Sequence, residues 1–341
     1  MKKPLIAVVD WKPEPRGDSR CTVEKEAIGK VARIKYFLCD KEEDWKGEVL
    51  KADAILLWHN TEMPESVINK LENCKCIVRN GTGFDTVDIL AASHRDIPVY
   101  NVPDYGTDEV ADQSIALALA LCRQVIPNHE HCKNLGWDVQ EKNKIRRFSE
   151  MYFGVIGLGR IGTSVALKAK ALGFKVAFYD PYLPDGVDKS LAIRRCQKLD
   201  EILMNMDVIS INCPLSKETL HMITKKEIKK MRKNAFIINT ARGPIIKKDD
   251  LFEALRDNRL GGAALDVIEN EPLRTKKEGN TPNLIVTPHC GFYSTQSFWE
   301  MKYKAASTAL KVLLGKNLEK NCINYKFLPR NYIKDYLPTI K

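Results

Sequence analysis

Short apolar segments alternate along this chain with stretches in which apolar residues recur every three or four positions. The apolar segments have the length of buried strands, and the stretches between them have the period of helices that pack on a sheet. Alternation of this kind predicts an α/β fold, in which parallel strands are joined by crossover helices. The predicted strands are residues 5–9, 33–38, 54–58, 76–79 and 99–101, and then 152–156, 176–179, 208–212, 235–239, 263–267 and 284–287.

The strands fall into two groups, which predicts two doubly wound, parallel-sheet domains. Between the groups, residues 107–123 form an apolar segment long enough for a helix buried between two domains or two subunits. Thr107 can cap this helix, and Asp108 and Glu109 suit its first turn. A second long helical pattern, residues 294–314, follows the last strand. Shorter predicted helices include residues 22–31, 64–71 and 249–257.

A glycine cluster, GLGRIG at residues 157–162, follows the first strand of the second group, and the next strand stops at Asp180. A strand–turn–helix–strand unit with GxGxxG at its first turn and an acid after its second strand is typical of a dinucleotide site. Gly157 allows the tight turn, Gly159 lets the backbone approach a pyrophosphate, and Gly162 lets the helix lie close to the sheet. The phosphates would sit at the N-terminus of the helix. The alternative is a tight turn that binds nothing.

The cofactor predicted for this site is NAD. The Asp180 carboxylate would accept hydrogen bonds from an adenosine ribose, and its charge would repel the 2′-phosphate of NADP. Asp180 is followed by Pro181 and Tyr182 rather than by an arginine. Arg194 and Arg195 lie further along the chain and leave NADP as the alternative.

The length and composition are those of a two-domain globular protein. A chain of 341 residues is long for one hydrophobic core, and its 44% hydrophobic and 29% charged residues are ordinary for such a protein. No apolar run approaches the roughly 20 residues that a membrane-spanning helix needs. The apolar stretch near the N-terminus is too short for a signal peptide and predicts a strand, so we expect a cytoplasmic location.

Neither the cysteines nor the positive charge indicates a different class of protein. The ten cysteines are scattered, with no CxxC motif and no Cys/His set of zinc-ligand spacing, so we expect reduced thiols and no metal site. The net charge of +10 makes nucleic acid an alternative partner, and the densest basic stretch is residues 225–233. This stretch has helical spacing around Ile228 and Met231, so a solvated helix face is favoured and nucleic-acid binding is not expected. A positive field would also attract an anionic cofactor and substrate.

Three polar residues that follow the last three predicted strands indicate a redox reaction on a keto acid. They are Arg242, Glu271 and His289, and ligands of open α/β sheets bind beyond the carboxyl ends of strands. His289 can donate a proton to a carbonyl oxygen as a hydride reaches the carbon. Glu271 would hold the ring and favour the imidazolium. Arg242 would bind the carboxylate and polarise the ketone through its planar guanidinium. The alternative is that all three are ordinary polar residues at strand ends.

Several motifs occur in a combination that is highly specific. They are RNGTGFDTVDI (residues 79–89), VIGLGRIG, FYDPYLPDG, NTARG, GGAALDVIENEP and TPHCGFYSTQ. From Leu5 to the neighbourhood of Leu314, the chain resembles the D-isomer-specific 2-hydroxyacid dehydrogenase family. Within that family, FYDPYLPDG and HCGFYSTQ most resemble the branch of the C-terminal-binding proteins, which includes animal transcriptional corepressors.

The resemblance implies two Rossmann-like domains with a discontinuous substrate domain. Residues 1–102 and 294–341 would form the substrate-binding domain, and residues 103–293 would form the NAD-binding domain. Members of the family are typically homodimers, built around the cofactor domain and the long helix that starts near Thr107. The partner molecule would be a small 2-hydroxy or 2-keto acid.

The resemblance also implies which residues bind and react. Arg242, Glu271 and His289 match the family's catalytic Arg, Glu and His, with His289 as the proton donor. The residues that would contact the substrate are Arg79, Gly81, Thr82 and Phe292. Those that would contact NAD are Thr82, Gly157, Gly159, Arg160, Ile161, Gly162, Asp180, Cys213, Pro214, Thr219, Thr240, Ala241, Arg242, Asp266, His289 and Gly291.

Two departures from the corepressor pattern bear on function. Phe292 stands where the corepressors carry a Trp that lines the substrate pocket, and the chain lacks their long tail after the last helix. We therefore expect an NAD-dependent dehydrogenase of 2-hydroxy acids. One alternative is an NAD(H)-sensing module that binds peptides of transcription factors. Another is a hydrolase of adenosyl thioethers on the same double-Rossmann plan, whose own motifs are not found in the sequence.

Overall fold

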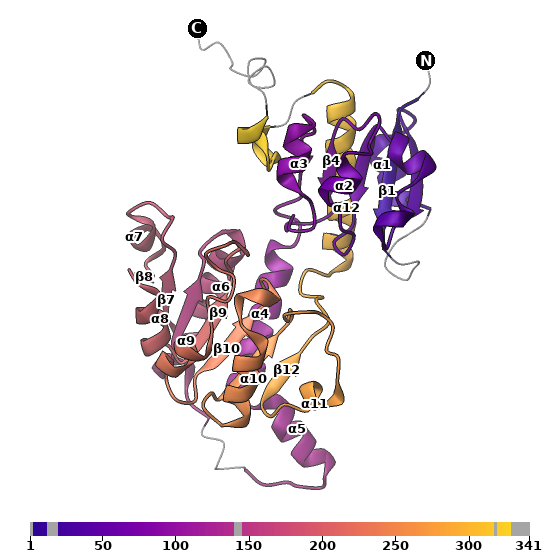
Figure 1. Cartoon of the computed structure of the whole chain (residues 1–341). Coiled ribbons are helices and arrows are strands. Elements are labelled where there is room, and N and C mark those ends of the chain that lie inside the picture. Colours follow the sequence, from indigo (N-terminus) through magenta and orange to yellow (C-terminus); the bar gives the residue numbers. More distant parts are fainter. Residues whose placement is uncertain (1–2, 12–19, 140–144, 317–318, 329–341) are drawn as a thin grey trace. The chain divides into compact units, whose positions relative to one another are not determined.

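The computed structural model describes residues 3–11, 20–139, 145–316 and 319–328, and the chain folds into two compact units (Figure 1). The discontinuous unit comprises Met1–Tyr105 and Ser294–Lys341, and the continuous unit comprises Gly106–Tyr293. Each unit is built on its own parallel sheet with its own hydrophobic core. The predicted fold class of two doubly wound, parallel-sheet domains is thereby confirmed.

The discontinuous unit contains a five-stranded sheet with the order β2-β1-β3-β4-β5, in which every strand pair is parallel. The first strand lies inside the sheet, and β1 and β3 are buried along their whole length, as expected for strands covered on both faces. The strands are β1 (Leu5–Asp10), β2 (Arg33–Leu38), β3 (Ala54–Leu57), β4 (Ile77–Arg79) and β5 (Val99–Tyr100). The helices are α1 (Thr22–Ile28), α2 (Glu65–Ile68), α3 (Ile89–His94) and α12 (Thr295–Leu313), with short 3₁₀ turns at Glu42–Asp44, Gly47–Lys51, Glu319–Asn321 and Tyr325–Phe327.

The C-terminal part of the chain returns to complete this unit. Helix α12 packs against α1, β3 and β4, and the Ser294 hydroxyl caps it by accepting from the Ser297 N–H at 2.9 Å. Beyond α12, the buried Asn324 attaches the chain to the β5 edge. Its Oδ1 accepts from the Val99 N–H at 2.8 Å, and its Nδ2 donates to the Ile97 carbonyl at 2.9 Å.

The continuous unit contains a seven-stranded sheet with the order β12-β11-β10-β9-β6-β7-β8, again with every strand pair parallel. The winding direction reverses between β6 and β9, and such a switch point is where open α/β sheets bind ligands. The strands are β6 (Tyr152–Ile156), β7 (Lys175–Tyr179), β8 (Arg194–Arg195), β9 (Val208–Ile211), β10 (Phe236–Asn239), β11 (Gly262–Leu265) and β12 (Leu284–Val286). The helices are α4 (Thr107–Cys122), α5 (Val125–Lys133), α6 (Arg160–Ala171), α7 (Val187–Leu191), α8 (Leu199–Asn205), α9 (Lys225–Lys230), α10 (Lys248–Arg256) and α11 (Lys276–Gly279), with 3₁₀ turns at Phe148–Glu150 and Gly243–Ile245.

The predicted strands are confirmed to within two residues at their ends, and the larger differences concern helices. The helix predicted for residues 22–31 ends at Ile28, because Gly29 has a φ of +57° and leaves the helical region. The predicted cap at Thr107 is wrong: Gly106 is the N-cap residue, and Thr107 is the first residue of α4. Strand β8 was not predicted, because both of its residues are arginines and carry no apolar signal.

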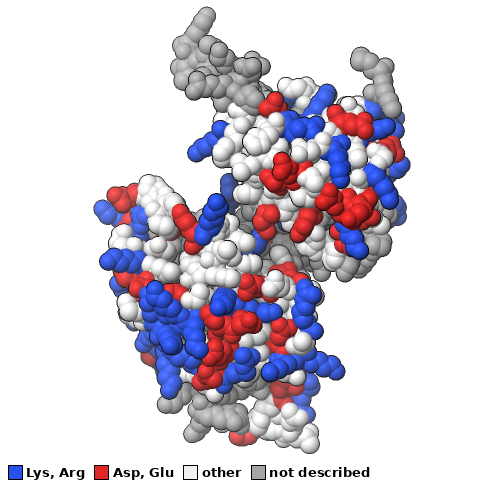
Figure 2. Space-filling view, viewed as in Figure 1, with Lys and Arg blue, Asp and Glu red and all other residues white. Residues whose placement is uncertain are grey.

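The basic stretch at residues 225–233 forms α9 and the turn after it. Lys225 lies 2.6 Å from the Glu253 carboxylate, and Lys230 lies 2.7 Å from that of Asp200. Figure 2 shows basic side chains gathered on this unit next to acidic ones. These ion pairs agree with the interpretation of the stretch as a solvated helix face.

All ten cysteines are free thiols, as expected. Burial raises the pKa of Cys39 and of Cys122 to about 12, so these two thiols stay protonated at neutral pH. Among the described residues, no helix combines the length and the apolar character needed to cross a bilayer. The cytoplasmic location stays a prediction.

Replacing Asn324 by alanine should destabilise the discontinuous unit, because the buried Val99 N–H would lose its acceptor. We expect the free energy of unfolding to fall by about 2–3 kcal/mol, the cost of lost hydrogen bonds plus a buried unsatisfied donor. Chemical denaturation followed by circular dichroism measures this change. Lys326→Ala is the matched control, since Lys326 is exposed on the same segment. An equal loss in both variants would contradict the anchoring role of Asn324.

Candidate functional site

The turn from β6 into α6 leaves no room for a side chain at two of its glycines. Gly157 has a φ of +85°, and a Cβ on it would lie 2.7 Å from the backbone nitrogen of Cys213. A Cβ on Gly162 would lie 1.9 Å from the Gly157 carbonyl oxygen, so α6 packs directly on the end of β6. Gly159 differs, because it is the N-cap residue of α6 and its Cβ would meet no atom within 4 Å. This open space at the N-terminus of α6 fits the pyrophosphate of a dinucleotide.

The Asp180 carboxylate lies beside the glycine turn. Its Oδ2 accepts from the backbone N–H of Leu158 at 2.9 Å, and its Oδ1 accepts from that of Tyr182 at 3.0 Å. These two bonds orient the carboxylate at the end of β7. An acid at this position suits the ribose hydroxyls of NAD and disfavours the 2′-phosphate of NADP.

Arg195, one of the two arginines that left NADP as an alternative, is engaged by the protein backbone. Its Nη2 donates to the carbonyl oxygens of Asp180 at 3.1 Å and Leu183 at 2.8 Å, and its Nη1 donates to that of Pro184 at 3.1 Å. The side chain is 11% exposed and also lies 3.6 Å from the Asp185 carboxylate. A guanidinium used in this way has few of its five donors left for a 2′-phosphate. The geometry therefore favours NAD.

His289 and Glu271 are brought together by the loops that follow β12 and β11. Nδ1 of His289 lies 3.0 Å from Oε2 of Glu271, whose Oε1 accepts from the Ile268 N–H at 3.3 Å. His289 has a φ of +50°, which a residue with a Cβ adopts only when its surroundings hold it there. Its N–H donates to the carbonyl oxygens of Asp266 at 2.9 Å and Thr287 at 3.0 Å.

The Asp266 carboxylate supports the loop that carries His289. Asp266 is 3% exposed, and its Oδ1 accepts from the Cys290 N–H at 3.1 Å and from the Thr287 hydroxyl. Its Oδ2 accepts from the Gly291 N–H at 2.8 Å, and a Cβ on Gly291 would lie 2.9 Å from this oxygen. Hydrogen bonds to a carboxylate are stronger than those between neutral groups. Asp266, predicted to contact the cofactor, is thus also the group that holds the backbone beyond His289.

Arg242 projects from a loop whose backbone is fixed at both ends. The buried Asn239, at the end of β10, accepts from the Ala241 N–H at 3.0 Å and donates to the Arg242 carbonyl at 2.8 Å. Nη1 of Arg242 donates to the Ala241 carbonyl at 2.7 Å. The Thr240 hydroxyl lies 2.6 Å from that of Ser114 on α4, which ties the loop to that helix.

The predicted cofactor residues after β9 form a compact turn. The Thr219 hydroxyl donates to the Pro214 carbonyl at 2.7 Å and accepts from the Ser216 N–H at 2.8 Å. Burial, with a smaller contribution from Asp180, raises the pKa of Cys213 to about 11. Cys213 is therefore a neutral packing group and not a nucleophile at neutral pH.

Arg79, Gly81 and Thr82 belong to the discontinuous unit, in the loop that follows β4. Nη1 of Arg79 donates to the Asn80 carbonyl at 2.9 Å and lies 1.8 Å from the place where a Cβ on Gly81 would be. Gly81 also has a φ of +136°, so the backbone conformation favours glycine there, and a side chain would in addition displace the guanidinium. The Thr82 hydroxyl donates to the Val102 carbonyl at 3.3 Å.

The predicted site residues therefore fall into two sets, one in each unit. In the continuous unit, Arg160 and Ile161 open α6, and Phe292 follows the His289 loop and lies 3.5 Å from the position of a Cβ on Gly106. Three supporting residues were not predicted: Ser114, Asn239 and Thr287. Asn239 and Thr287 open the motifs NTARG and TPHCGFYSTQ but were given no role there, and no motif marks Ser114. The signal that could have found all three is a small polar side chain at a strand end or inside an apolar helix.

Residues 115–291 match the family model of the D-isomer specific 2-hydroxyacid dehydrogenase, NAD binding domain. The chain belongs to this family. The predicted family and the predicted cofactor, NAD, are thereby confirmed.

The relatives include two dehydrogenases and a C-terminal-binding protein. D-3-phosphoglycerate dehydrogenase of Methanocaldococcus jannaschii is 33% identical over 297 residues, which are 87% of this chain and 56% of that protein. C-terminal-binding protein 1 of Caenorhabditis elegans is 29% identical over 341 residues, covering 96% of this chain and 46% of that protein. The chain thus spans about half the length of these curated relatives. A D-lactate dehydrogenase of Aquifex aeolicus, solved with NAD and lactic acid, has a TM-score of 0.83 at 26% identity, covering 94% of this chain and 99% of that one.

Alanine at Gly159 and at Gly162 should weaken NADH binding for two different reasons. The Cβ of Gly159→Ala would occupy open space, so the unfolding temperature should not change. The same Cβ would keep the pyrophosphate from the backbone N–H groups. The Kd for NADH should therefore rise about tenfold, which corresponds to the loss of roughly one hydrogen bond. Gly162→Ala collides with the Gly157 carbonyl and should also lower the free energy of unfolding by about 1–3 kcal/mol. Fluorescence titration and calorimetry measure the two effects. A Gly159→Ala variant that binds NADH as tightly as the wild type would exclude the assigned pyrophosphate position.

Proposed function

We propose that this chain is an oxidoreductase that uses NAD to transfer a hydride between the nicotinamide and a small 2-hydroxy or 2-keto acid. The observation that carries this proposal is the His289–Glu271 pair, which lies in the same unit as a glycine turn that fits NAD. Membership of the D-isomer-specific 2-hydroxyacid dehydrogenase family supports it.

His289 would act as the proton donor in the reductive direction. Glu271 engages Nδ1, so Nε2 is the ring nitrogen that would give its proton to the carbonyl oxygen of the keto acid. The Glu271 carboxylate would hold the ring in this orientation, and solvent would restore the proton after transfer. In the oxidative direction the neutral imidazole would accept the hydroxyl proton. When bound, NADH would supply the hydride in the reductive direction and NAD⁺ would take it up in the oxidative direction.

The carboxylate of the substrate would be held by arginine. The Arg242 guanidinium is planar and can donate two parallel hydrogen bonds to a carboxylate, from a loop that Asn239 keeps in place. The resemblance to the family also assigns substrate contacts to Arg79, Gly81 and Thr82. Phe292 would contribute an apolar wall, which favours an acid with an apolar or aromatic substituent.

The chain should oxidise NADH in the presence of a 2-keto acid, and His289 should be essential. A suitable panel contains pyruvate, glyoxylate, branched 2-keto acids, and hydroxypyruvate with and without a 3-phosphate, because the relatives include a lactate and a 3-phosphoglycerate dehydrogenase. His289→Ala should lower kcat about 100- to 10,000-fold by removing the proton donor, with the Kd for NADH unchanged. Absorbance of NADH follows turnover. No turnover with any acid, or full activity in His289→Ala, would refute the proposal.

The alternative of a peptide-binding, NAD(H)-sensing module has less support. It rests on the similarity to C-terminal-binding protein 1. A binding module has no need of an imidazole paired with a carboxylate, whereas a dehydrogenase does, and the pair is present. We therefore favour the enzyme.

We also propose that the chain forms a homodimer through the surface around α5. Leu135 is 94% exposed and Trp137 is 91% exposed, and Val125, Ile126 and Val139 are exposed as well. Large apolar side chains that are close in sequence and open to water mark an interaction surface. Helix α5 follows α4 directly, and α4 is the helix around which dimers of this family are expected, so a second copy of the chain is the proposed occupant.

Polar substitutions on this surface should separate the two copies. In sedimentation experiments the wild type should have twice the mass of one chain, and the double variant Leu135→Ser, Trp137→Ser should shift to a single chain. Leu90→Ser is the matched control, because Leu90 is an exposed leucine of the discontinuous unit. A wild type that sediments as a monomer, or a control that dissociates equally, would exclude this interface.

A further inference from the structure

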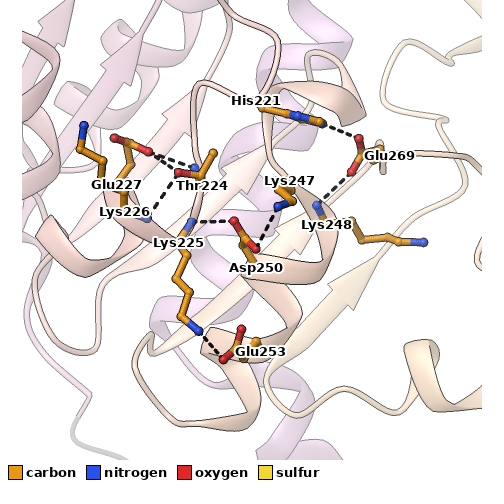
Figure 3. A network of polar contacts seen from close by, with 10 residues as sticks. All are labelled: His221, Thr224, Lys225, Lys226, Glu227, Lys247, Lys248, Asp250, Glu253 and Glu269. Atoms are coloured by element: carbon orange, nitrogen blue, oxygen red, sulfur yellow. Dashed lines mark hydrogen bonds and ion pairs between the residues drawn. The ribbon is translucent and has the colours of Figure 1, made fainter.

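His221 and Glu269 form a second His–Glu pair (Figure 3). Nε2 of His221 lies 2.5 Å from Oε1 of Glu269, and Glu269 is two residues before Glu271 in the same loop. The side chains are 39% and 21% exposed, so the pair is partly shielded from water. A hydrogen bond this short between ionisable groups is charge-assisted and strong.

The other carboxylate oxygen of Glu269 anchors the loop to α10. Its Oε2 accepts from the backbone N–H of Lys248, the first residue of that nine-residue helix. Burial by itself would raise the pKa of Glu269, but the bonds from His221 and from the Lys248 N–H lower it below its usual value, so the group stays ionised. The ammonium of Lys248 points away from Glu269 in Figure 3 and lies 2.7 Å from the Glu278 carboxylate.

His221 belongs to the loop after β9, and its backbone is attached to the segment that follows Arg242. Its N–H donates to the Pro244 carbonyl at 2.8 Å. Two residues later, the Ile223 N–H donates to the Ile245 carbonyl at 3.1 Å. The backbone that carries the His221 imidazole is therefore coupled to the Arg242 loop by hydrogen bonds.

Gly243 allows the loop that carries Arg242 and the loop that carries Glu271 to come into direct backbone contact. A Cβ on Gly243 would lie 2.0 Å from the Ile268 carbonyl oxygen and 2.5 Å from the Glu269 nitrogen. The backbone next to Arg242 thus touches the backbone next to Glu271, with no side chain between them. Three loops, which follow β9, β10 and β11, meet at this junction, and the side chains of His221 and Glu269 join across it.

We infer that His221 and Glu269 are a positioning pair, which holds the loop bearing Glu271 against the loop bearing Arg242. This inference rests on the proposed function and deepens it. The pair would act through Glu271 and Arg242 and not on the substrate itself. Catalysis depends steeply on such placement, since a shift of about 1 Å can cost about 100-fold in rate.

The test compares Glu269→Ala with Glu253→Ala. Glu253 lies on α10 in the same network, and its bond to Lys225 of α9 has a similar length, 2.6 Å (Figure 3). With NADH and the acid of the panel that is turned over fastest, Glu269→Ala should lower kcat about tenfold or more, while the KM for NADH changes less than threefold. Glu253→Ala should keep the wild-type kcat. Thermal unfolding confirms that both variants are folded.

Variants of the partner test whether the bond itself matters. His221→Gln retains a side-chain N–H donor for Glu269 and should keep most of the activity, whereas His221→Ala should lose as much kcat as Glu269→Ala. The double variant His221→Ala, Glu269→Ala should be no slower than either single one, because the two residues act as one unit. Additive losses, or a Glu269→Ala kcat within twofold of the wild type, would overturn the inference. If Glu269→Ala does not fold, the comparison of His221→Ala with His221→Gln still tests the inference.

A failure of the proposed function would be recognised separately. If the wild type turns over none of the acids, the proposed reaction is refuted. The role of His221 and Glu269 as a positioning pair can then still be tested by amide hydrogen exchange. Glu269→Ala should speed exchange in residues 266–272 about tenfold, and Glu253→Ala should leave it unchanged. Unchanged exchange in both variants would overturn the positioning role.

Discussion

In the continuous unit, all seven strands run parallel, and the loops that leave the carboxyl ends of neighbouring strands therefore meet at one edge of the sheet. Strands β9, β10, β11 and β12 are consecutive neighbours, and the loops after the last three carry Arg242, Glu271 and His289. The glycine turn after β6 lies on the other side of β9. A single constraint, the common direction of the strands, thus places the proposed reacting groups and the cofactor turn on the same edge.

The common direction of the strands brings the loops together, but side chains near the strand ends hold them in place. Asn239, Asp266 and Glu269 each accept backbone N–H groups of their own or a neighbouring loop. Removing such polar groups from water is costly unless their hydrogen bonds are made, so they fix one loop arrangement strongly. The Asp266 carboxylate binds the two residues that follow His289, whose φ is positive. The residues that support the site must therefore be of a particular type, just as the reacting residues must be.

Glycine residues allow close contacts with the backbone in both units. Gly162 lets α6 rest on β6, Gly243 lets the Arg242 loop rest on the Glu271 loop, and Gly81 lets the Arg79 guanidinium fold over its own chain. At each place, a Cβ would collide with an atom less than 2.1 Å away. Packing against backbone requires glycine at Gly162 and Gly243, and the positive φ favours it at Gly81.

Local spacing in the sequence by itself determined every strand except β8, the glycine turn, the acid at Asp180 and the family to which the chain belongs. These features depend on residues that are neighbours in the chain, so apolar periodicity and short motifs reveal them. Only the tertiary structure decided how the site is supported. Asp266 meets Gly291, Asn324 meets Val99, and His221 meets Glu269 across long stretches of chain. Such pairs have no spacing rule, because hydrogen bonds between distant segments form only after the sheet has brought the strand ends together.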